Sequence, residues 1–218
     1  MAYSKEVVKV AQKLGYKWIV IDELGFPSSR TYIPDRIYEI DGLKDFSVFF
    51  RERGLSFVVL SAQLGTMSSI IRYLGDRLQR NDYAITAMDG ETFGHHRPGM
   101  EKFLFDLLSD ERIDTVMLSD LPGDFPNLET VDPRPSTWAV TEQDMERGEP
   151  YARWKRSDNP IQLKQWQLTE LAISVAHRTP DNVDIRAALD RALHSDQYWW
   201  ASARPWWSLE MIERGAFE

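Results

Sequence analysis

The sequence lacks cysteine, long apolar runs and an excess of basic residues. Without cysteine, the chain cannot form disulfide bonds, use a thiolate nucleophile or bind zinc through sulfur, and this composition is typical of cytoplasmic proteins. No stretch is long and apolar enough for a membrane span, and the first residues do not resemble a signal peptide. The 34 acidic residues outnumber the 26 basic ones, and the formal net charge of -8 opposes binding to nucleic acids or anionic lipids. We therefore expect a cytoplasmic protein with neither a nucleic acid nor a membrane as partner.

Aromatic residues, by contrast, are plentiful. The 218 residues are 43% hydrophobic and 12% aromatic, which is enough for one sizeable core or for one domain with an appended lobe. Most of the eight tryptophans are expected to anchor cores, because each buries a large area. Four of them cluster, as Trp199–Trp200 and Trp206–Trp207. For this cluster two interpretations stay open: a buried core, or an exposed platform for the apolar face of a sugar ring.

The first part of the chain alternates predicted helices and strands. Ser4 suits the N-cap of a first helix, Gly15 suits its end, where φ is positive, and a short buried strand follows at 18–21. Further strands are expected at 47–50, 57–60, 83–88 and 114–118, and further helices at 70–78 and 98–108, the last with Pro98 at its first position. This alternation favours a mostly parallel sheet, open or closed as a barrel. Because no strand precedes the first helix, the order of elements indicates truncation at the N-terminus.

The second part of the chain has a different character. Prolines at positions 122, 126, 133 and 135 interrupt any periodicity, and from Pro160 onward the pattern is helical. Two apolar stripes are expected there, formed by Leu168, Leu171, Ala172, Val175 and Ala176 and by Ile185, Ala188, Leu189, Ala192 and Leu193. We therefore predict an α/β region over residues 1–120, followed by a loop-rich and then helical region over residues 121–218.

Asp89 is the first residue whose position indicates chemistry. It follows the predicted strand 83–88, with Gly90 next to it and Glu91 two residues on. Carboxylates at the C-terminal end of a strand are exposed at the top of a sheet, and two of them can shift each other's pKa toward values that acid/base catalysis needs. The alternative is that Asp89 or Glu91 caps the following turn, which is a common role for an Asp-Gly pair.

The stretch Met88–His96, which reads MDGETFGHH, is similar to the fourth conserved motif of glycoside hydrolase family 57. Four other stretches resemble that family in the same order: Met1–Ser4 with Gly15 and Trp18–Glu23; Phe49–Ser56; Ser136–Ala139 leading to Trp154 and Trp166; and His194–Trp200. Phe57 departs from the pattern, in which a polar or acidic residue is expected after Leu55–Ser56. The resemblance spans essentially the whole chain.

Membership of this family implies a retaining glycoside hydrolase or 4-α-glucanotransferase that acts on α-glucans. The resemblance makes Asp89 the general acid/base and implies a partial (β/α)7-type barrel followed by a helical region. The family's nucleophilic Glu precedes the segment matched by Met1–Tyr3, so we expect a fragment without its nucleophile that is inactive in isolation. We expect α-glucan or another oligosaccharide as ligand, and self-association through a sheet edge that the missing strands leave uncovered. The residues expected to contact substrate are Glu91, His95, His96, Arg51, Asp196, Trp199 and Trp200.

Several of these residues suit a second interpretation. Asp89 with His95 and His96 suggests a metal-dependent polysaccharide deacetylase, but adjacent histidines on a loop rarely bind one metal, so we expect neither a metal nor a cofactor. Arg51 suits a sugar contact or a surface ion pair equally well. A non-catalytic carbohydrate-binding or structural remnant is the main rival function. Asp196 suits a helix cap as well as a substrate contact, and His177 and His194 are expected on a helix surface or in a core.

Overall fold

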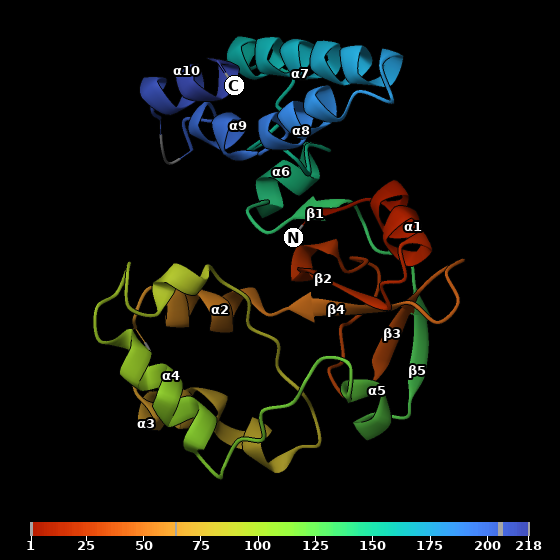
Figure 1. The fold of residues 1–218 in the computed structure, drawn as a ribbon. Helices are drawn as coiled ribbons and strands as arrows, with labels where there is room; N and C mark the ends of the chain where they lie inside the picture. The colour runs from red at the N-terminus through yellow and green to blue at the C-terminus, as the bar shows by residue number, and fades with distance from the viewer. Residues whose placement is uncertain (1, 64, 205–206, 218) are drawn as a thin grey trace. The chain divides into compact units, whose positions relative to one another are not determined.

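The computed structural model describes residues 2–63, 65–204 and 207–217. The chain forms two compact units, Met1–Trp138 and Ala139–Glu218, which we call the sheet unit and the helical unit (Figure 1). We expected the α/β region to end near residue 120. In the structure, residues 121–138 group with the sheet unit, because β5 (Leu128–Val131) and β6 (Ser136–Thr137) both pair with strands inside it. The functional division at residue 120 stays a prediction.

The main sheet has four strands in the order β2-β4-β3-β5. β2 (Trp18–Asp22) runs parallel to β4 (Ser47–Arg51), with Asp22 directly opposite Arg51, whereas β3 (Ile37–Ile40) is antiparallel to β4 and parallel to β5. A second sheet pairs β1 (Ala2–Tyr3) with β6, so a two-residue strand does precede the first helix, contrary to the predicted order of elements. The fold is therefore mixed α/β, as predicted, but the described strands do not close into a barrel.

Strand β4 lies at the centre of the sheet unit, because its alternating side chains enter two cores. Val48 and Phe50 join one core with Tyr3, Val8 and residues of β3 and β5, while Phe49 joins the other with Ile37, Tyr83 and Leu121. This alternation follows from the two-residue period of a strand. The two strand predictions at 18–21 and 47–50 are confirmed.

The helices of the sheet unit begin with α1 (Lys5–Lys13). Ser4 caps it as predicted, since its Oγ accepts a hydrogen bond from the Val7 amide at 3.3 Å, and Gly15 adopts a φ of +90°. Figure 1 shows α2 (Arg53–Leu60), α3 (Met67–Leu74) and α4 (Met100–Ser109) grouped beyond the C-terminal end of β4. The remaining helical segments are α5 (Leu121–Asp124) and the 3-10 turns η1 (Glu23–Gly25), η2 (Gly75–Gln79) and η3 (Gly90–Thr92).

Three strand predictions in this unit are wrong. Residues 57–60 belong to helix α2, because Leu55 and Val59, four residues apart, are buried together against α3 and α4. Residues 83–88 and 114–118 are not assigned to strands. The start of one helix is also shifted: α4 begins at Met100 rather than Pro98, since Gly99 has a φ of +95° and cannot continue a helix backward.

The helical unit contains α6 (Glu142–Glu146), α7 (Pro160–Arg178), α8 (Val183–Ala192), α9 (Asp196–Trp200) and α10 (Leu209–Phe217). Pro160 begins α7 as predicted, after Asn159, whose side chain caps the helix. No helix in the described ranges is long and apolar enough to cross a membrane.

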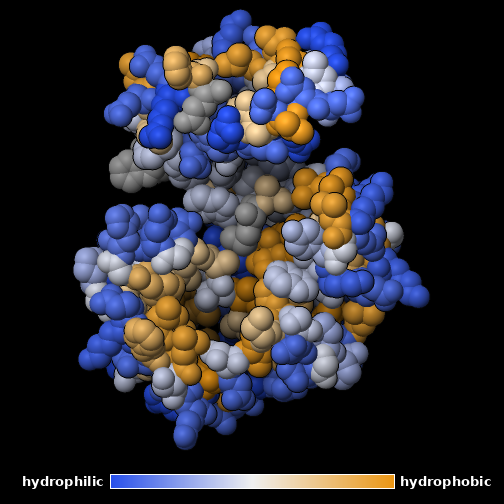
Figure 2. All heavy atoms as spheres, in the orientation of Figure 1, coloured by the Kyte–Doolittle hydropathy of each residue, from blue (hydrophilic) through white to orange (hydrophobic). Residues whose placement is uncertain are grey.

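The apolar stripe predicted on α7 does not form the buried face of this helix. Leu168 and Leu171 remain 46% and 57% exposed, whereas Gln162 and Gln165 are buried. Hydrophobic side chains accordingly reach the surface over the helical unit in Figure 2. The Gln162 amide explains the choice of face: it donates to the backbone oxygens of Arg153 at 2.8 Å and Tyr198 at 3.0 Å. Such bonds satisfy a buried amide that would otherwise be costly to desolvate.

Candidate active site

A buried ion-pair cluster occupies the C-terminal ends of β2 and β4. The parallel register brings Asp22 beside Arg51, and Arg53 approaches from the start of α2. The Asp22 carboxylate is completely buried and accepts from Arg51 Nη2 at 3.0 Å, Arg53 Nη1 at 2.8 Å and the Leu24 amide at 3.0 Å. Three donors offset the cost of removing this charge from water.

Arg51 also reaches two backbone carbonyls. Its Nη1 donates to the Ala87 oxygen and its Nη2 to the Trp138 oxygen, both at 3.2 Å. Burial lowers the pKa of the Arg51 guanidinium, and the charge of Asp22 opposes this fall. The side chain is only 11% exposed. Of the two roles weighed for Arg51, an ion pair is therefore observed, although it lies in the interior and not at the surface.

Asp89 follows an extended segment that approaches these strand ends. Residues 83–88 form no ladder, but the Glu52 amide donates to the Ile85 oxygen at 2.8 Å and the Ala87 amide to Ser56 Oγ at 3.3 Å. Asp89 is the N-cap residue of η3, yet its side chain makes no capping hydrogen bond and is exposed. The carboxylate is therefore open to solvent instead of being used to hold the turn.

Two other acidic residues lie near the strand ends. Glu23 is half-buried in η1, where burial raises the pKa of its carboxyl group and a hydrogen bond from the Arg53 backbone opposes the rise. Glu52 is engaged elsewhere, since Arg77 donates to both of its carboxylate oxygens, at 2.7 and 3.0 Å. A partly buried carboxyl with a raised pKa is one form of general acid.

The loop after Asp89 carries three of the predicted contact residues, Glu91, His95 and His96, and all three are exposed. The two imidazole rings lie 5.2 Å apart, centroid to centroid. Among the residues that the structure describes, no group of three or more acidic or histidine side chains could hold a metal ion.

The remaining predicted site residues belong to the helical unit. Asp196 is exposed at the first position of α9, and the N-cap position is Ser195. Trp199 is half-buried, with its ring 5.4 Å from that of Trp154 and the Arg153 guanidinium 6.0 Å from its centroid. Trp200 is half-buried and Trp207 is 50% exposed, while Trp206 lies outside the described residues.

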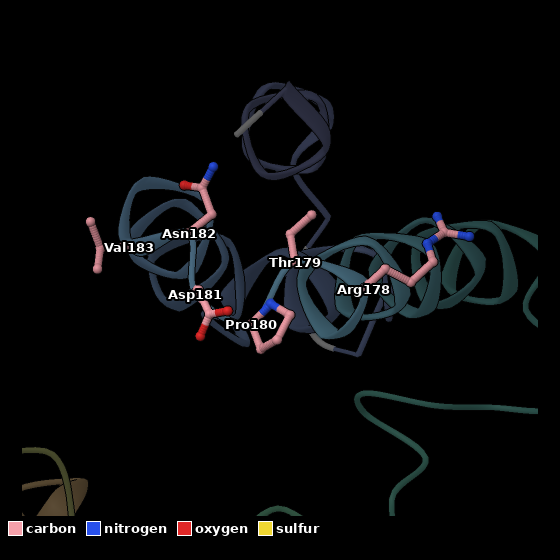
Figure 3. Close-up of a pocket in the computed structure, with 6 residues that line it drawn as sticks. All are labelled: Arg178, Thr179, Pro180, Asp181, Asn182 and Val183. Carbon is pink, nitrogen blue, oxygen red and sulfur yellow. The ribbon is translucent and has the colours of Figure 1, made fainter.

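The two histidines outside the motif lie in the helical unit as well: His177 is exposed on α7, and His194 is half-buried before α9. A surface depression at the turn between α7 and α8 contains none of the predicted site residues (Figure 3). The side chains around it, such as Arg178, Asp181 and Val183, point away from one another, so they do not converge on a ligand.

Sequence reasoning missed Asp22 and Arg53. Both lie in stretches that resemble the family, but their importance depends on which strand is the neighbour of β2. That information is not local in the sequence. The available signal was the pair of charged residues at the ends of two predicted strands, Asp22 after 18–21 and Arg51 after 47–50.

Comparisons with known proteins give two findings. A family model described as glycosyl hydrolase family 57 matches residues 1–132, which include Arg51 and Asp89. The crystal structure of 4-alpha-glucanotransferase from Thermococcus litoralis is similar in fold, with a TM-score of 0.64 and 20% identity. The match covers 91% of this chain and 37% of that one, so the chain spans little more than a third of the length of the solved structure. Among curated proteins, none matches significantly.

Proposed function

Because the chain belongs to glycosyl hydrolase family 57, whose model matches residues 1–132, we propose that it supplies the acid/base carboxylate of a retaining reaction on α-glucans. In such a reaction one carboxylate attacks the anomeric carbon while a second protonates the leaving oxygen. Asp89 takes the second role. It then removes a proton from water in a hydrolase, or from a sugar hydroxyl in a glucanotransferase.

The exposed and uncapped carboxylate of Asp89 is the observation that carries this proposal. A turn-capping aspartate would spend its oxygens on backbone amides, and a structural one would be paired with a cation. Asp89 makes no capping bond and lies on a loop whose preceding backbone is held at the strand ends by Arg51 and Ser56. This arrangement supports a group that is accessible to substrate and fixed at its base.

Substrate contacts are proposed on both units. Glu91, His95 and His96 are exposed on the same loop as Asp89 and carry donors and acceptors for sugar hydroxyls. In the helical unit, the half-buried Trp199 and Trp200 offer apolar ring faces, and the exposed Asp196 offers an acceptor. We also propose that the four-stranded sheet is a part of a (β/α)7-type barrel.

The second carboxylate is not assigned within residues 1–218. The resemblance matches no glutamate of this chain to the nucleophile, so we propose that the 218-residue chain binds α-glucan without turning it over. Glu23 and Glu91 are the alternative nucleophiles: Glu23 lies at the same strand ends as the ion-pair cluster, and Glu91 lies two residues after Asp89 in η3. Self-association through a sheet edge stays a prediction, which sedimentation of the purified chain would test.

The experiment replaces Asp89 by asparagine, which keeps the shape but cannot transfer the proton. Maltoheptaose binding is measured by calorimetry, and turnover is measured for the 218-residue chain and for any longer polypeptide that its gene encodes. We expect Asp89→Asn to retain binding and to lose at least about a hundredfold in turnover wherever the parent is active. Asp106→Asn, on the exposed face of α4, is the matched control.

Three outcomes would count against the proposal. Parent-like turnover by the Asp89→Asn variant would remove the assigned role. Turnover by the 218-residue chain that Glu23→Gln abolishes would place the nucleophile inside this sequence. Loss of activity on treatment with EDTA would favour the metal-dependent deacetylase instead, because a retaining pair of carboxylates needs no metal.

A further inference from the structure

We propose that Asp22 and Arg51 act as a positioning pair that fixes the backbone immediately before Asp89. This inference rests on the proposed role of Asp89, and it assigns Arg51, whose side chain is only 11% exposed, to positioning instead of the substrate contact expected from the resemblance. Its basis is a continuous set of contacts from the buried Asp22 carboxylate, through the Arg51 guanidinium, to the Ala87 carbonyl.

The first step is the immobilisation of Arg51. The Asp22 carboxylate is fully buried and bonded to three donors, so it has a single orientation. Arg51 binds it through Nη2, and the planar guanidinium then fixes the direction of Nη1 as well. A rigid, desolvated ion pair holds a side chain far more firmly than an exposed one, because water cannot replace either partner.

The second step is the transfer of this rigidity to the catalytic loop. Residues 83–88 are not paired with a neighbouring strand, and isolated hydrogen bonds hold them instead of a continuous ladder. The bond from Arg51 Nη1 to the Ala87 oxygen is made two residues before Asp89, and the backbone bonds of η3 begin only at the Asp89 oxygen. Arg51, which binds the Ala87 oxygen, and Ser56, which accepts from the Ala87 amide, therefore fix the point where the loop leaves the strand ends. A shift of about 1 Å at a catalytic group can cost on the order of a hundredfold in rate.

The same guanidinium binds the carbonyl of Trp138, at 3.2 Å. Trp138 is the last residue of the sheet unit. One buried side chain thus fixes two points of the backbone that are distant in sequence, Ala87 and Trp138. A lysine, which lacks the planar fork, could not reproduce this geometry.

Arg53 provides a matched control. It donates to the same Asp22 carboxylate at 2.8 Å, yet its side chain is 30% exposed, and within the described ranges it makes no hydrogen bond to Ala87. Loss of Arg53 therefore weakens the ion pair without releasing the loop. Loss of the Arg51 fork removes the bond to the Ala87 oxygen even if the charge is kept, and leaves Ala87 bonded only through its amide to Ser56.

The test compares Arg51→Lys with Arg53→Gln in the purified 218-residue chain. Two readouts are measured: amide hydrogen exchange at Ala87, Thr92, Phe93 and His96, and the 13C resonance of the Asp89 carboxylate. We expect Arg51→Lys to speed exchange at these amides by at least about tenfold and to move the Asp89 resonance, with strands β3 and β5 unchanged. Arg53→Gln should change exchange by less than about threefold and leave the resonance in place.

Where turnover is measurable, Arg51→Lys should lower kcat by about ten- to a hundredfold with KM within about threefold, because substrate contacts are retained. Asp22→Asn is a further variant, and Arg51→Lys remains decisive if Asp22→Asn fails to fold. Equal effects of Arg51→Lys and Arg53→Gln, or none from Arg51→Lys, would overturn the proposal. The exchange and resonance results do not depend on turnover, so they separate a failure of this inference from a failure of the acid/base role of Asp89.

Discussion

In the sheet unit, strand β4 buries Val48, Phe49 and Phe50 completely, whereas helix α7 of the helical unit buries Gln162 and leaves Leu168 and Leu171 about half exposed. The strand has two hydrophobic faces to fill and one neighbour on each edge, so apolar residues decide its position. The helix is held by side-chain amides that bond to backbone carbonyls of other segments. The hydrophobic pattern therefore accounts for the position of β4 but not for the face that α7 buries.

Among the variants that test this comparison, Phe50→Ala is expected to lower the unfolding free energy most. Phe50 is fully buried, and its ring contacts those of Phe26, Tyr32 and Tyr38 at centroid distances of 5.0, 5.5 and 5.8 Å. We expect a loss of about 3–5 kcal/mol in unfolding free energy, because a large cavity is left among rigid neighbours. Phe105→Ala, at a site 68% exposed on α4, should cost less than about 0.5 kcal/mol.

The two variants are compared by urea denaturation, with amide exchange in β3 and β5 as the local readout. Equal losses for Phe50→Ala and Phe105→Ala would mean that the aromatic core does not determine the stability of the sheet unit.

Gln162→Leu tests the other half of the comparison. Leucine is the more hydrophobic residue, but it leaves the Arg153 and Tyr198 carbonyls and the Arg156 amide without their bonds to this side chain. We expect a destabilisation of about 1–3 kcal/mol, confined to the helical unit. Gln167→Leu, on the exposed surface of α7, is the matched control and should stay within about 0.5 kcal/mol of the parent.

Amide exchange in α7 and α9 measures this effect separately from the sheet unit. A more stable Gln162→Leu variant would show that hydrophobic burial outweighs the amide bonds here too, and the contrast between the two units would disappear.

The smallest expected effect comes from Glu23→Gln, which sharpens the comparison at the polar end of the sheet unit. Because burial raises the folded-state pKa of Glu23 above its ordinary value of 4.5, the folded protein keeps a proton that the unfolded chain releases. Stability contributed by this group therefore falls as pH rises from about 4.5 through the folded pKa. Glutamine removes this dependence, so the urea midpoint of the variant should fall less between pH 4.5 and 7 than that of the parent. Identical slopes would contradict the prediction.

Local signals in the sequence were sufficient for several elements. The first helix lies between Ser4 and Gly15, and a long helix begins at Pro160. Strands are found at Trp18–Ile21 and Ser47–Phe50. These elements could be predicted because caps, turn residues and buried runs act over a few residues. The strand prediction at 57–60 is wrong because contacts with distant segments decide the structure there. The β-branched character of these residues favours a strand, but burial of Leu55 and Val59 against α3 and α4 selects a helix.

The candidate site shows the same division. Asp89 is recognised from a contiguous motif, and its exposure could be expected from its place after an extended segment. The partners of Arg51 could not be predicted, since Asp22, Ala87 and Trp138 are 29, 36 and 87 residues away from it. Only the register of β2 on β4 and the path of the later chain bring them together.

That register has a consequence for how the sheet assembles. Successive side chains of a strand point to opposite faces, so a slip of β2 by one residue against β4 would turn Asp22 away and place Ile21 or Glu23 beside Arg51. Removing one partner of a buried ion pair costs about 3–5 kcal/mol, a large share of the stability of a small unit. The apolar residues Ile19–Ile21 could pack against β4 in several registers, but Asp22 lies beside Arg51 in only one of them. A shifted register would leave a buried charge unpaired, so Asp22 and Arg51 favour the observed alignment of β2 on β4 over its neighbours.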